Sequence, residues 1–349
     1  MRKPTYAFLT VLLCACGDGA DPTLDLAPHD HGESSPPDDS PQQQVADAAT
    51  APPATQPGST ASQGSWSTGA SMLTRRTELS VAELNGKIYV AGGYGGLNAF
   101  DSYDVKANRW ARHANLPASR NHAAMAAVDG KILLAGGTPF DATGRSDLVW
   151  SYDPTTDRWS ERAKLPNARY GAGAAVVNGK VYVIGGTGPS DRAVLIYDPQ
   201  ADKWTSGGQL SVTRDHVAVA VLDGKIWAIG GRVRDQGVFD TTEIYDPATD
   251  KFTPGPKMND SHSGFGAGVI DGKIYVAGGE VLVQPYFVRD TVEVYEPATG
   301  KWRYQAKLPF PLHGTGAATY DGKFFLIGGA SRAASASPMT GGGVNVFTP

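Results

Sequence analysis

Six apolar runs in this sequence end in the same way, in a pair of glycines. The runs, such as 87–91 and 180–184, contain the β-branched and aromatic residues that favour strands. The first glycines of the pairs are separated by 44, 49, 45, 48 and 50 residues and are Gly92, Gly136, Gly185, Gly230, Gly278 and Gly328. A period of this length indicates a β unit that packs against copies of itself.

Two other features keep a constant register within each unit. An aromatic residue stands 26 positions before every first glycine, at Trp66, Trp110, Trp159, Trp204, Phe252 and Trp302. Between the two lies an Asn-Gly or Asp-Gly pair, at 85–86, 129–130, 178–179, 223–224, 271–272 and 321–322. These dipeptides favour the type I′ turn that joins antiparallel strands. We therefore predict six tight hairpins, with small residues before each turn and large ones after it.

A second aromatic residue stands seven positions before the Trp or Phe of the next unit, at Tyr103, Tyr152, Tyr197, Tyr245 and Tyr295. All length variation between units falls between the diglycine and this tyrosine. A diglycine followed by Tyr and Trp seven residues apart resembles the kelch repeat, whereas the Gly-His and Trp-Asp signatures of WD40 repeats are absent from the sequence. The resemblance implies an all-β fold, a six-bladed kelch β-propeller over residues 65–349.

The two ends of the repeat region are incomplete in complementary ways. The last unit stops after its third strand, where Phe347 takes the tyrosine position, and Trp66 belongs to a fourth strand that lacks the first three. Pairing these segments would complete the sixth blade and remove two exposed sheet edges. We predict that the N-terminal strand closes the last blade.

The first sixteen residues resemble a bacterial lipoprotein signal peptide. Arg2 and Lys3 precede an apolar run, 6–13, that is too short for a permanent membrane span. The segment 13–16 resembles a lipobox, which implies lipidation at Cys16; the alternative is an ordinary signal peptide with incidental cysteines. The resemblance implies a lipid-anchored protein of the cell envelope, with Gly17 matching outer-membrane sorting, on either the periplasmic or the surface face.

Residues 17–64 are acidic and rich in Pro, Ser and Gln, which predicts a disordered tether. Eight of the chain's carboxylates lie there, so the formal charge of -4 misrepresents the repeat region. Without them and the two N-terminal cations, 29 basic and 27 acidic residues remain, and nothing favours nucleic acid as a partner. His29 and His31 lack a third ligand, so we predict no metal and no other cofactor. We expect a monomer that contacts the membrane through its lipid only.

Candidate binding residues recur in the loops that lead into the innermost strands. Ten positions after each repeat aromatic stand Arg76, Arg120, Arg169, Arg214, His262 and Leu312, and two positions further stand Glu78, His122, Gly171, His216, Gly264 and Gly314. We expect the cations to gather at one mouth of the central channel, where arginine can hold a carboxylate or sulfate. The alternative is a structural role, because this arginine is common in kelch repeats and can bond loop carbonyls.

The variable loops belong to the same face, because alternating strands bring the loop between the second and third strands beside the loop into the next blade. They span 94–99, 138–147, 187–192, 232–240, 280–290 and 330–343. Loops on a rigid scaffold commonly carry recognition. Their large side chains are Tyr94, Phe140, Arg232, Arg234, Gln284, Tyr286 and Phe287.

These features favour a binding module for a glycan, an anionic small molecule or an envelope protein. The alternative is a carbohydrate-active enzyme, since sialic acid mutarotases are also six-bladed kelch propellers. That resemblance would make Glu280 the proton-transferring carboxylate, with Arg214 or Arg232 binding the acid group of the sugar. Galactose oxidase also has a kelch-type domain, but its copper site needs a cysteine, and both cysteines here lie in the signal segment. The sequence excludes that chemistry in its known form.

Overall fold

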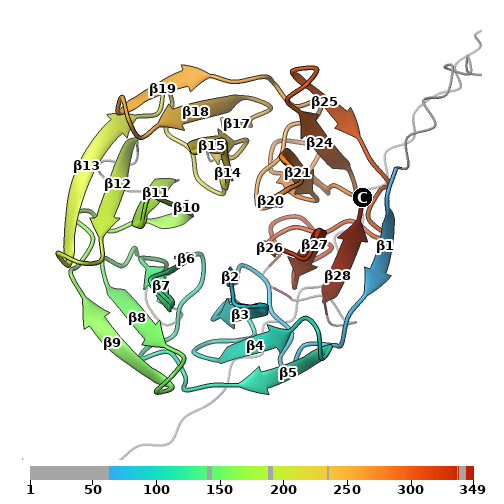
Figure 1. The fold of residues 1–349 in the computed structure, drawn as a ribbon. Coiled ribbons are helices and arrows are strands. Elements are labelled where there is room, and N and C mark those ends of the chain that lie inside the picture. The colour runs from blue at the N-terminus through green and yellow to red at the C-terminus, as the bar shows by residue number, and fades with distance from the viewer. Residues whose placement is uncertain (1–62, 140–143, 188–191, 234–235, 336, 338–342) are drawn as a thin grey trace, which may run out of the picture. The chain divides into compact units, whose positions relative to one another are not determined.

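The computed structural model describes residues 63–139, 144–187, 192–233, 236–335, 337 and 343–349. Within these ranges every regular element is a β-strand, and the strands form six four-stranded antiparallel sheets around one axis (Figure 1). The expected all-β, six-bladed propeller is confirmed. Cys16, residues 17–62, Phe140 and Arg234 lie outside the described residues. None of the described residues belongs to a helix with the length and apolarity that a membrane span requires.

Each of the first five blades is formed by a continuous segment of the chain. The first blade contains β2 (Ser80–Leu84), β3 (Lys87–Ala91), β4 (Phe100–Asp104) and β5 (Arg109–Arg112). The second contains β6 (Ala124–Val128), β7 (Lys131–Ala135), β8 (Val149–Asp153) and β9 (Arg158–Arg162). The third contains β10 (Tyr170–Val177), β11 (Lys180–Thr187), β12 (Ala193–Asp198) and β13 (Lys203–Gln209).

The fourth and fifth blades each carry an extra two-stranded ribbon in the loop after the second strand. The fourth contains β14 (Ala218–Leu222), β15 (Lys225–Ile229), β18 (Thr242–Asp246) and β19 (Lys251–Pro254), with the ribbon β16 (Arg232–Val233) and β17 (Gly237–Val238). The fifth contains β20 (Gly266–Ile270), β21 (Lys273–Ala277), β24 (Val292–Glu296) and β25 (Lys301–Tyr304), with the ribbon β22 (Glu280–Val281) and β23 (Phe287–Val288).

The sixth blade joins the two ends of the repeat region. It contains β26 (Gly316–Tyr320), β27 (Lys323–Ile327), β28 (Val344–Thr348) and, as its outer strand, β1 (Ser65–Thr68). Trp66 is paired with Phe347 in the antiparallel register of β1 and β28. The predicted closure by the N-terminal strand is therefore confirmed, and Figure 1 shows β1 lying along the outer side of β28.

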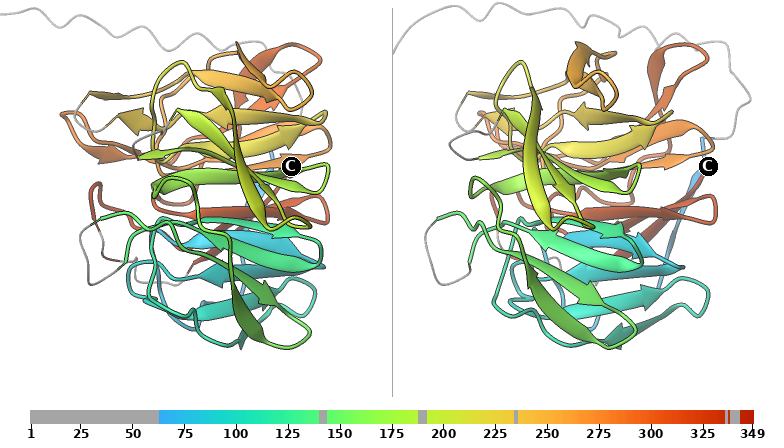
Figure 2. Two further views of the ribbon diagram at one scale, coloured as in Figure 1. Left: turned by 90° about the vertical axis from the view of Figure 1, so that its left-hand side faces the viewer. Right: turned by 60° about the vertical axis from the view of Figure 1, so that its left-hand side comes forward.

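The core lies between successive blades, whose sheets are seen from the side in Figure 2. One cluster of buried side chains, for example, joins Ala126 and Leu133 of the second blade to Val181 and Leu195 of the third. The inner strands β2, β6, β10, β14, β20 and β26 are rich in Ala, Gly and Val, because each approaches the inner strands of both neighbouring blades around the axis. The bulky residues after each turn fill the wider space further out.

The constant spacing of the two repeat aromatics has a direct structural cause. Each tyrosine and the Trp or Phe seven residues later are register partners on the third and fourth strands, for example Tyr152 with Trp159. The rings of the six aromatic pairs, that of Trp66 and Phe347 included, lie 4.9–5.5 Å apart. Each of the five tryptophans in these pairs also donates its indole N–H to a carbonyl after the fourth strand of the preceding blade, as Trp159 does to Ala114. Phe252 has no such donor.

The diglycines allow the blades to be joined through their backbones. The second glycine of each pair donates its N–H to a carbonyl of the next blade at 2.7–2.9 Å, from Gly93 to Arg120 and onward to the closing contact of Gly329 with Arg76. A side chain on the first glycine would collide with the same carbonyl, since a Cβ on Gly92 would lie 2.0 Å from the oxygen of Arg120. Glycine is required there by this close approach as well as by the positive φ.

Removing either partner of the closing pair should unfold the propeller. Deleting residues 64–68, or the chain from Val344 onward, exposes the edge of the last sheet and the buried ring of Phe347. We expect the cooperative thermal transition to be lost or to shift down by more than about 10 °C, given that 1 kcal/mol moves the midpoint by roughly 2–4 °C in a domain of this size. Calorimetry of a chain lacking residues 20–55 is the control, and an equal shift there would contradict this account of closure.

Candidate functional site

A closed circle of backbone hydrogen bonds surrounds the axis just before the inner strands begin. One residue per blade takes part, and its N–H donates to the carbonyl of the equivalent residue in the preceding blade at 2.7–3.1 Å. The six residues, called the axial ring below, are Glu78, His122, Gly171, His216, Gly264 and Gly314. The last bond, from Glu78 to Gly314, closes the circle.

Three of the ring positions carry side chains where the backbone favours glycine. All six have positive φ, and Glu78, His122 and His216 adopt values of 53°, 54° and 52°. This conformation costs a residue with a side chain on the order of 1 kcal/mol. The other three blades place glycine at the same position, so the fold does not itself require Glu or His there. We infer that these three side chains serve a purpose other than stability.

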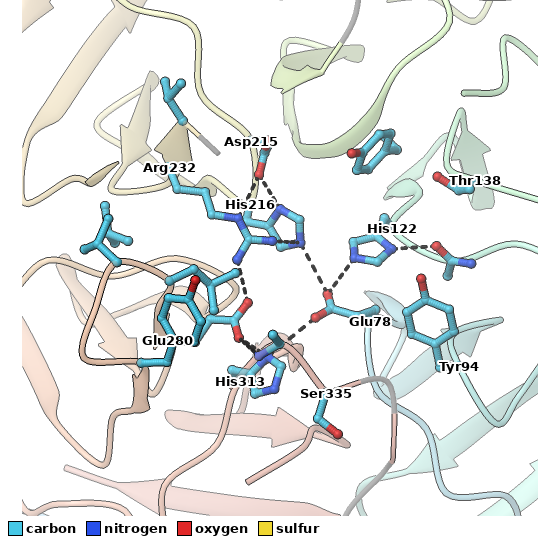
Figure 3. Close-up of a pocket in the computed structure, with 18 of the residues that line it drawn as sticks. Glu78, Tyr94, His122, Thr138, Asp215, His216, Arg232, Glu280, His313 and Ser335 are labelled. Atoms are coloured by element: carbon cyan, nitrogen blue, oxygen red, sulfur yellow. Dashed lines mark hydrogen bonds and ion pairs between the residues drawn. The ribbon is translucent and has the colours of Figure 1, made fainter. Parts of the chain in front are cut away.

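A cavity of about 710 Å³ opens on the loop side of the axial ring (Figure 3). Its wall draws mainly on three sets of equivalent positions: the ring itself, the residue before each ring residue, and the residue after each diglycine. From these sets come Glu78, His122, His216, Asn121, Tyr170, Asp215, His313, Tyr94, Thr138, Arg232 and Glu280. A smaller cavity of about 100 Å³ is lined by the ring residues and by the residue that follows each of them.

The carboxylate of Glu78 lies at the centre of this group. One of its oxygens is 3.2 Å from Nε2 of His122 and 3.7 Å from Nε2 of His216, and the other is 3.6 Å from Nδ1 of His313. Burial alone would raise the pKa of Glu78, but the facing imidazoles outweigh it and hold that pKa well below its usual range. Glu78 is therefore an anion at the floor of the cavity.

Arg232 ties the opposite side of the cluster together. Its guanidinium donates to Oε1 of Glu280 at 2.5 Å, to Oδ1 of Asp215 at 3.2 Å and to Nε2 of His216 at 3.0 Å. Burial, with the charge of Arg232, lowers the pKa of His216 despite its contact with Asp215. Burial also opposes protonation of His313, but the carboxylates of Glu78 and Glu280 raise its pKa. The site thus holds acids and bases whose pKa values are pushed in opposite directions, which is common at functional sites.

Six of the sequence-predicted site residues line this cavity. They are His122 and His216 from the axial ring, and Tyr94, Arg232, Glu280 and Tyr286 from the loops after the diglycines. Glu280 is not an exposed loop carboxylate, because it is 2% exposed and accepts hydrogen bonds from Arg232 and from the backbone N–H of Ala334. Tyr286 lies further out and is 53% exposed.

The predicted ring of cations at the channel mouth needs correction. Arg76, Arg120, Arg169, Arg214 and His262 are all buried, and none is among the described residues that line the cavity. Arg169 donates to the carbonyls of Gly185 and Ala193, and Arg214 to those of Gly230 and Thr241. These side chains fasten the loop between the second and third strands of their own blade. Their placement agrees with the structural alternative.

In four blades, the residue at the second position of the third strand explains how the buried cation is accommodated. Asp101 pairs with Arg76, Glu243 with Arg214 at 2.8 Å, and Glu293 with His262 at 3.3 Å. In the second blade this position is Trp150, and the guanidinium of Arg120 stacks over its ring at 4.6 Å. Burial lowers the pKa of Arg76 to about 10, with a further contribution from Arg112.

The sequence-based selection missed Asp215, His313, Asn121 and Tyr170. Each precedes an axial ring position by one residue, between the two positions that the sequence pattern had singled out. This residue pairs in a short antiparallel bridge with the residue after the diglycine, as Asp215 does with Arg232 and His313 with Ala330. A comparison of all six repeats at this intermediate position would have found them.

The sequence comparisons agree with this repeat structure. Residues 61–206 match the KLHDC2/KLHL20/DRC7 kelch-repeats domain, and residues 213–259 and 261–309 each match the kelch motif. The chain is a kelch-repeat β-propeller. The solved structure of YjhT resembles the propeller with a TM-score of 0.69 and 19% identity, over 81% of this chain and 96% of that one. At this identity the likeness shows the fold alone. No curated protein matches the chain in sequence.

Because Arg169 and Arg214 of this kelch propeller are buried and hold loops in place, removal of such an arginine should affect stability. Replacing Arg214 by Met leaves Glu243 buried without its guanidinium and takes one donor away from each of two carbonyls, those of Gly230 and Thr241. We expect the free energy of unfolding to fall by about 3 kcal/mol, as is typical when one partner of a buried ion pair is removed. Chemical denaturation measures this. Arg145→Met, at an exposed cavity residue, is the control, and an equally small change in both variants would contradict the structural role.

Proposed function

We propose that this kelch propeller is a binding module for a small, uncharged, polyhydroxylated ligand of the glycan class, held in the cavity above the axial ring. The observation that carries the proposal is the convergence of hydrogen-bonding side chains from several blades on one cavity of about 710 Å³. This volume lies within the range of roughly 300–1,000 Å³ that is usual for small-molecule sites.

The charges of the cavity favour a neutral ligand over an anion. Three carboxylates, those of Glu78, Asp215 and Glu280, line the inner wall, and the guanidinium of Arg232 is already shared among Glu280, Asp215 and His216. An anionic ligand would have to displace these contacts. The arginines that would have attracted it are buried between strands instead. This removes the main argument for an anionic ligand.

The remaining wall suits a sugar. The aromatic rings of Tyr94, Tyr170 and Tyr286 provide flat apolar surfaces with a polar edge, while Asn121 and Thr138 offer amide and hydroxyl groups. Burial, with the nearby Glu78, raises the pKa of Tyr94, so its hydroxyl keeps its proton and remains a donor. Such a mixture of rings and hydrogen-bonding groups can orient a ring bearing several hydroxyls.

We also propose that the chain is a lipid-anchored protein of the cell envelope. The support is the resemblance of residues 1–16 to a lipoprotein signal peptide with lipidation at Cys16, followed by the acidic, Pro-rich segment 17–64. A propeller attached in this way would present its cavity to soluble or cell-wall glycans, with the lipid as its contact with the membrane. An envelope protein as ligand has no comparable support in the cavity.

Ligand binding can be tested on the full-length chain with a panel of neutral monosaccharides and oligosaccharides, using saturation-transfer NMR and calorimetry. We expect saturable binding that His122→Gly weakens roughly 10-fold or more, equivalent to about 1.4 kcal/mol. Glycine is the natural residue at three equivalent ring positions, so this variant should fold.

Two surface tyrosines provide a matched control. Tyr286 and Tyr304 are both 53% exposed, but only Tyr286 is among the residues that line the cavity. We expect Tyr286→Ala to weaken binding and Tyr304→Ala to leave it unchanged. Equal effects of the two variants, or no saturable binding to any neutral glycan of the panel, would refute the proposal.

A second candidate function is carbohydrate isomerisation of the sialic acid mutarotase type. The specific observation in its favour is that Glu280, the expected proton-transferring carboxylate, lies in the cavity beside His313 and Arg232, with 3.2 Å between its Oε2 and Nδ1 of His313. Arg214, the other expected partner, pairs with Glu243 outside the cavity. In such an enzyme Arg232 alone would bind the acid group of the sugar.

Anomer exchange followed by NMR separates the two candidates. If the enzyme hypothesis holds, the chain accelerates exchange of sialic acid, and Glu280→Gln abolishes the acceleration while Tyr304→Ala does not. A rate equal to that in buffer excludes this activity and leaves the binding proposal untouched.

A further inference from the structure

Three histidines around Glu78 are oriented in the same way. Each uses its outer ring nitrogen to contact a fixed acceptor: His122 the side-chain oxygen of Asn121 at 2.5 Å, His216 a carboxylate oxygen of Asp215 at 2.5 Å, and His313 the carbonyl of Arg332 at 2.7 Å. An oxygen acceptor fixes the N–H on the outer nitrogen. In a neutral ring the inner nitrogen then carries no proton, and its lone pair points toward the carboxylates at the axis (Figure 3).

The inner nitrogen of His216 has a donor, but that of His313 does not. Nε2 of His216 accepts from the guanidinium of Arg232 at 3.0 Å. Nδ1 of His313 is fully buried and has no hydrogen-bond partner among the described residues. It lies 3.2 Å from Oε2 of Glu280 and 3.6 Å from Oε1 of Glu78, both of them acceptors. Lone pairs that face one another at this distance need a proton or a cation between them.

The charge of the cluster leads to the same requirement. With neutral imidazoles, the carboxylates of Glu78, Asp215 and Glu280 and the single guanidinium of Arg232 leave a net charge of two negative units in a largely buried group. Uncompensated buried charge is costly. Two protons on the imidazoles, or one divalent cation, would neutralise it. The two possibilities differ in what the site can bind and are experimentally distinct.

We propose that Glu78, Glu280 and His313 form a binding site for one divalent first-row transition metal ion. Their ligand atoms, two carboxylate oxygens and Nδ1 of His313, lie within 4.8 Å of one another, which places all three within reach of a common centre. A set of two carboxylates and one imidazole suits Zn²⁺ and ions of similar preference. The side facing the cavity remains open for water or for a hydroxyl of a ligand.

The outer contacts are those expected of metal ligands. Ligating histidines commonly donate their second nitrogen to a carbonyl or carboxylate, which fixes the ring and the tautomer. His313 does so to Arg332, and Glu280 is held by Arg232 and by the backbone N–H of Ala334. These contacts hold His313 and Glu280, two of the three proposed ligands, in place. The atoms that would bind the metal face the axis.

A second cluster of similar composition differs in how much of its charge is left uncompensated. Asp260, His262 and Glu293 also bring three potential ligands together. There, however, the carboxylate of Glu293 already accepts from the backbone N–H groups of Asn259 and Asp260 and from the amide of Asn259. His262 bonds the carbonyl of Gly278 with its other nitrogen. Arg289 also pairs with Asp260 at 3.0 Å, and Nε2 of His262 lies 3.3 Å from Oε1 of Glu293. With neutral imidazoles, two carboxylates and one guanidinium leave that cluster with less uncompensated negative charge than the one around Glu78, so a cation is not called for.

Zn²⁺ binding to the full-length chain tests the proposal. After removal of metal with a chelator, equilibrium dialysis against Zn²⁺ with elemental analysis should give one tightly bound ion per chain. Glu280→Gln and His313→Gln should each weaken binding roughly 100-fold or more, since even residues that only support metal ligands contribute 10–100-fold. Glu78→Gly should do the same, and because glycine occupies three equivalent ring positions it should not unfold the propeller.

The tether supplies the control. A chain with His29→Ala and His31→Ala lacks the histidines of the N-terminal segment, and its tight Zn²⁺ site should be unchanged. Loss of that site in the tether variant, or its persistence in Glu280→Gln, would overturn the proposal, as would the absence of Zn²⁺ binding. Glycan binding by the metal-free chain is measured separately, so failure of the metal site and failure of the proposed function can be told apart.

Discussion

The circle of backbone hydrogen bonds from Glu78 to Gly314 constrains both the fold and the site. Each blade contributes one N–H and one carbonyl, so the circle closes only when the last of the six blades returns to the first. Its geometry demands a positive φ at every position. The same conformation directs the side chains that are present toward the axis. Ring closure and placement of the Glu and His side chains are therefore consequences of one contact.

The repeat is regular where it builds the scaffold and irregular where it forms the cavity. The aromatic pairs, the diglycine contacts and the Asn-Gly or Asp-Gly turns recur with little change in every blade. At the ring position, by contrast, three blades carry glycine and three carry Glu or His. The residues around them differ as well, with Asp215 and His313 at equivalent positions. A propeller can vary these positions because the backbone bonds that join the blades do not depend on the side chains.

The buried arginines and the cluster around Glu78 and Glu280 differ in how their charges are paired. Around the arginines each cation has carbonyls and, in several blades, an acid or aromatic partner, so the groups fasten loops to blades. Around Glu78 and Glu280, acceptors face acceptors, and Nδ1 of His313 has no hydrogen-bond donor among the described residues. Three carboxylates near the axis are accompanied by the single guanidinium of Arg232, and such an excess of buried like charge is unfavourable in a purely structural cluster. This contrast is the main reason for assigning stability to the first group and ligand binding to the second.

The sequence alone determined the six blades, the hairpins, the aromatic pairs and the closing strand, because each follows from local spacing: strand alternation, turn chemistry and fixed distances along the chain. It also identified Tyr94, His122, His216, Arg232, Glu280 and Tyr286 as side chains of the cavity face. Only the tertiary structure decided that Arg76, Arg169 and Arg214 turn into the wall, and that Glu78, Asp215 and His313 meet at the axis. Such side chains come from different blades, more than 90 residues apart in the case of Asp215 and His313, and their orientation depends on contacts that exist only once the ring is closed.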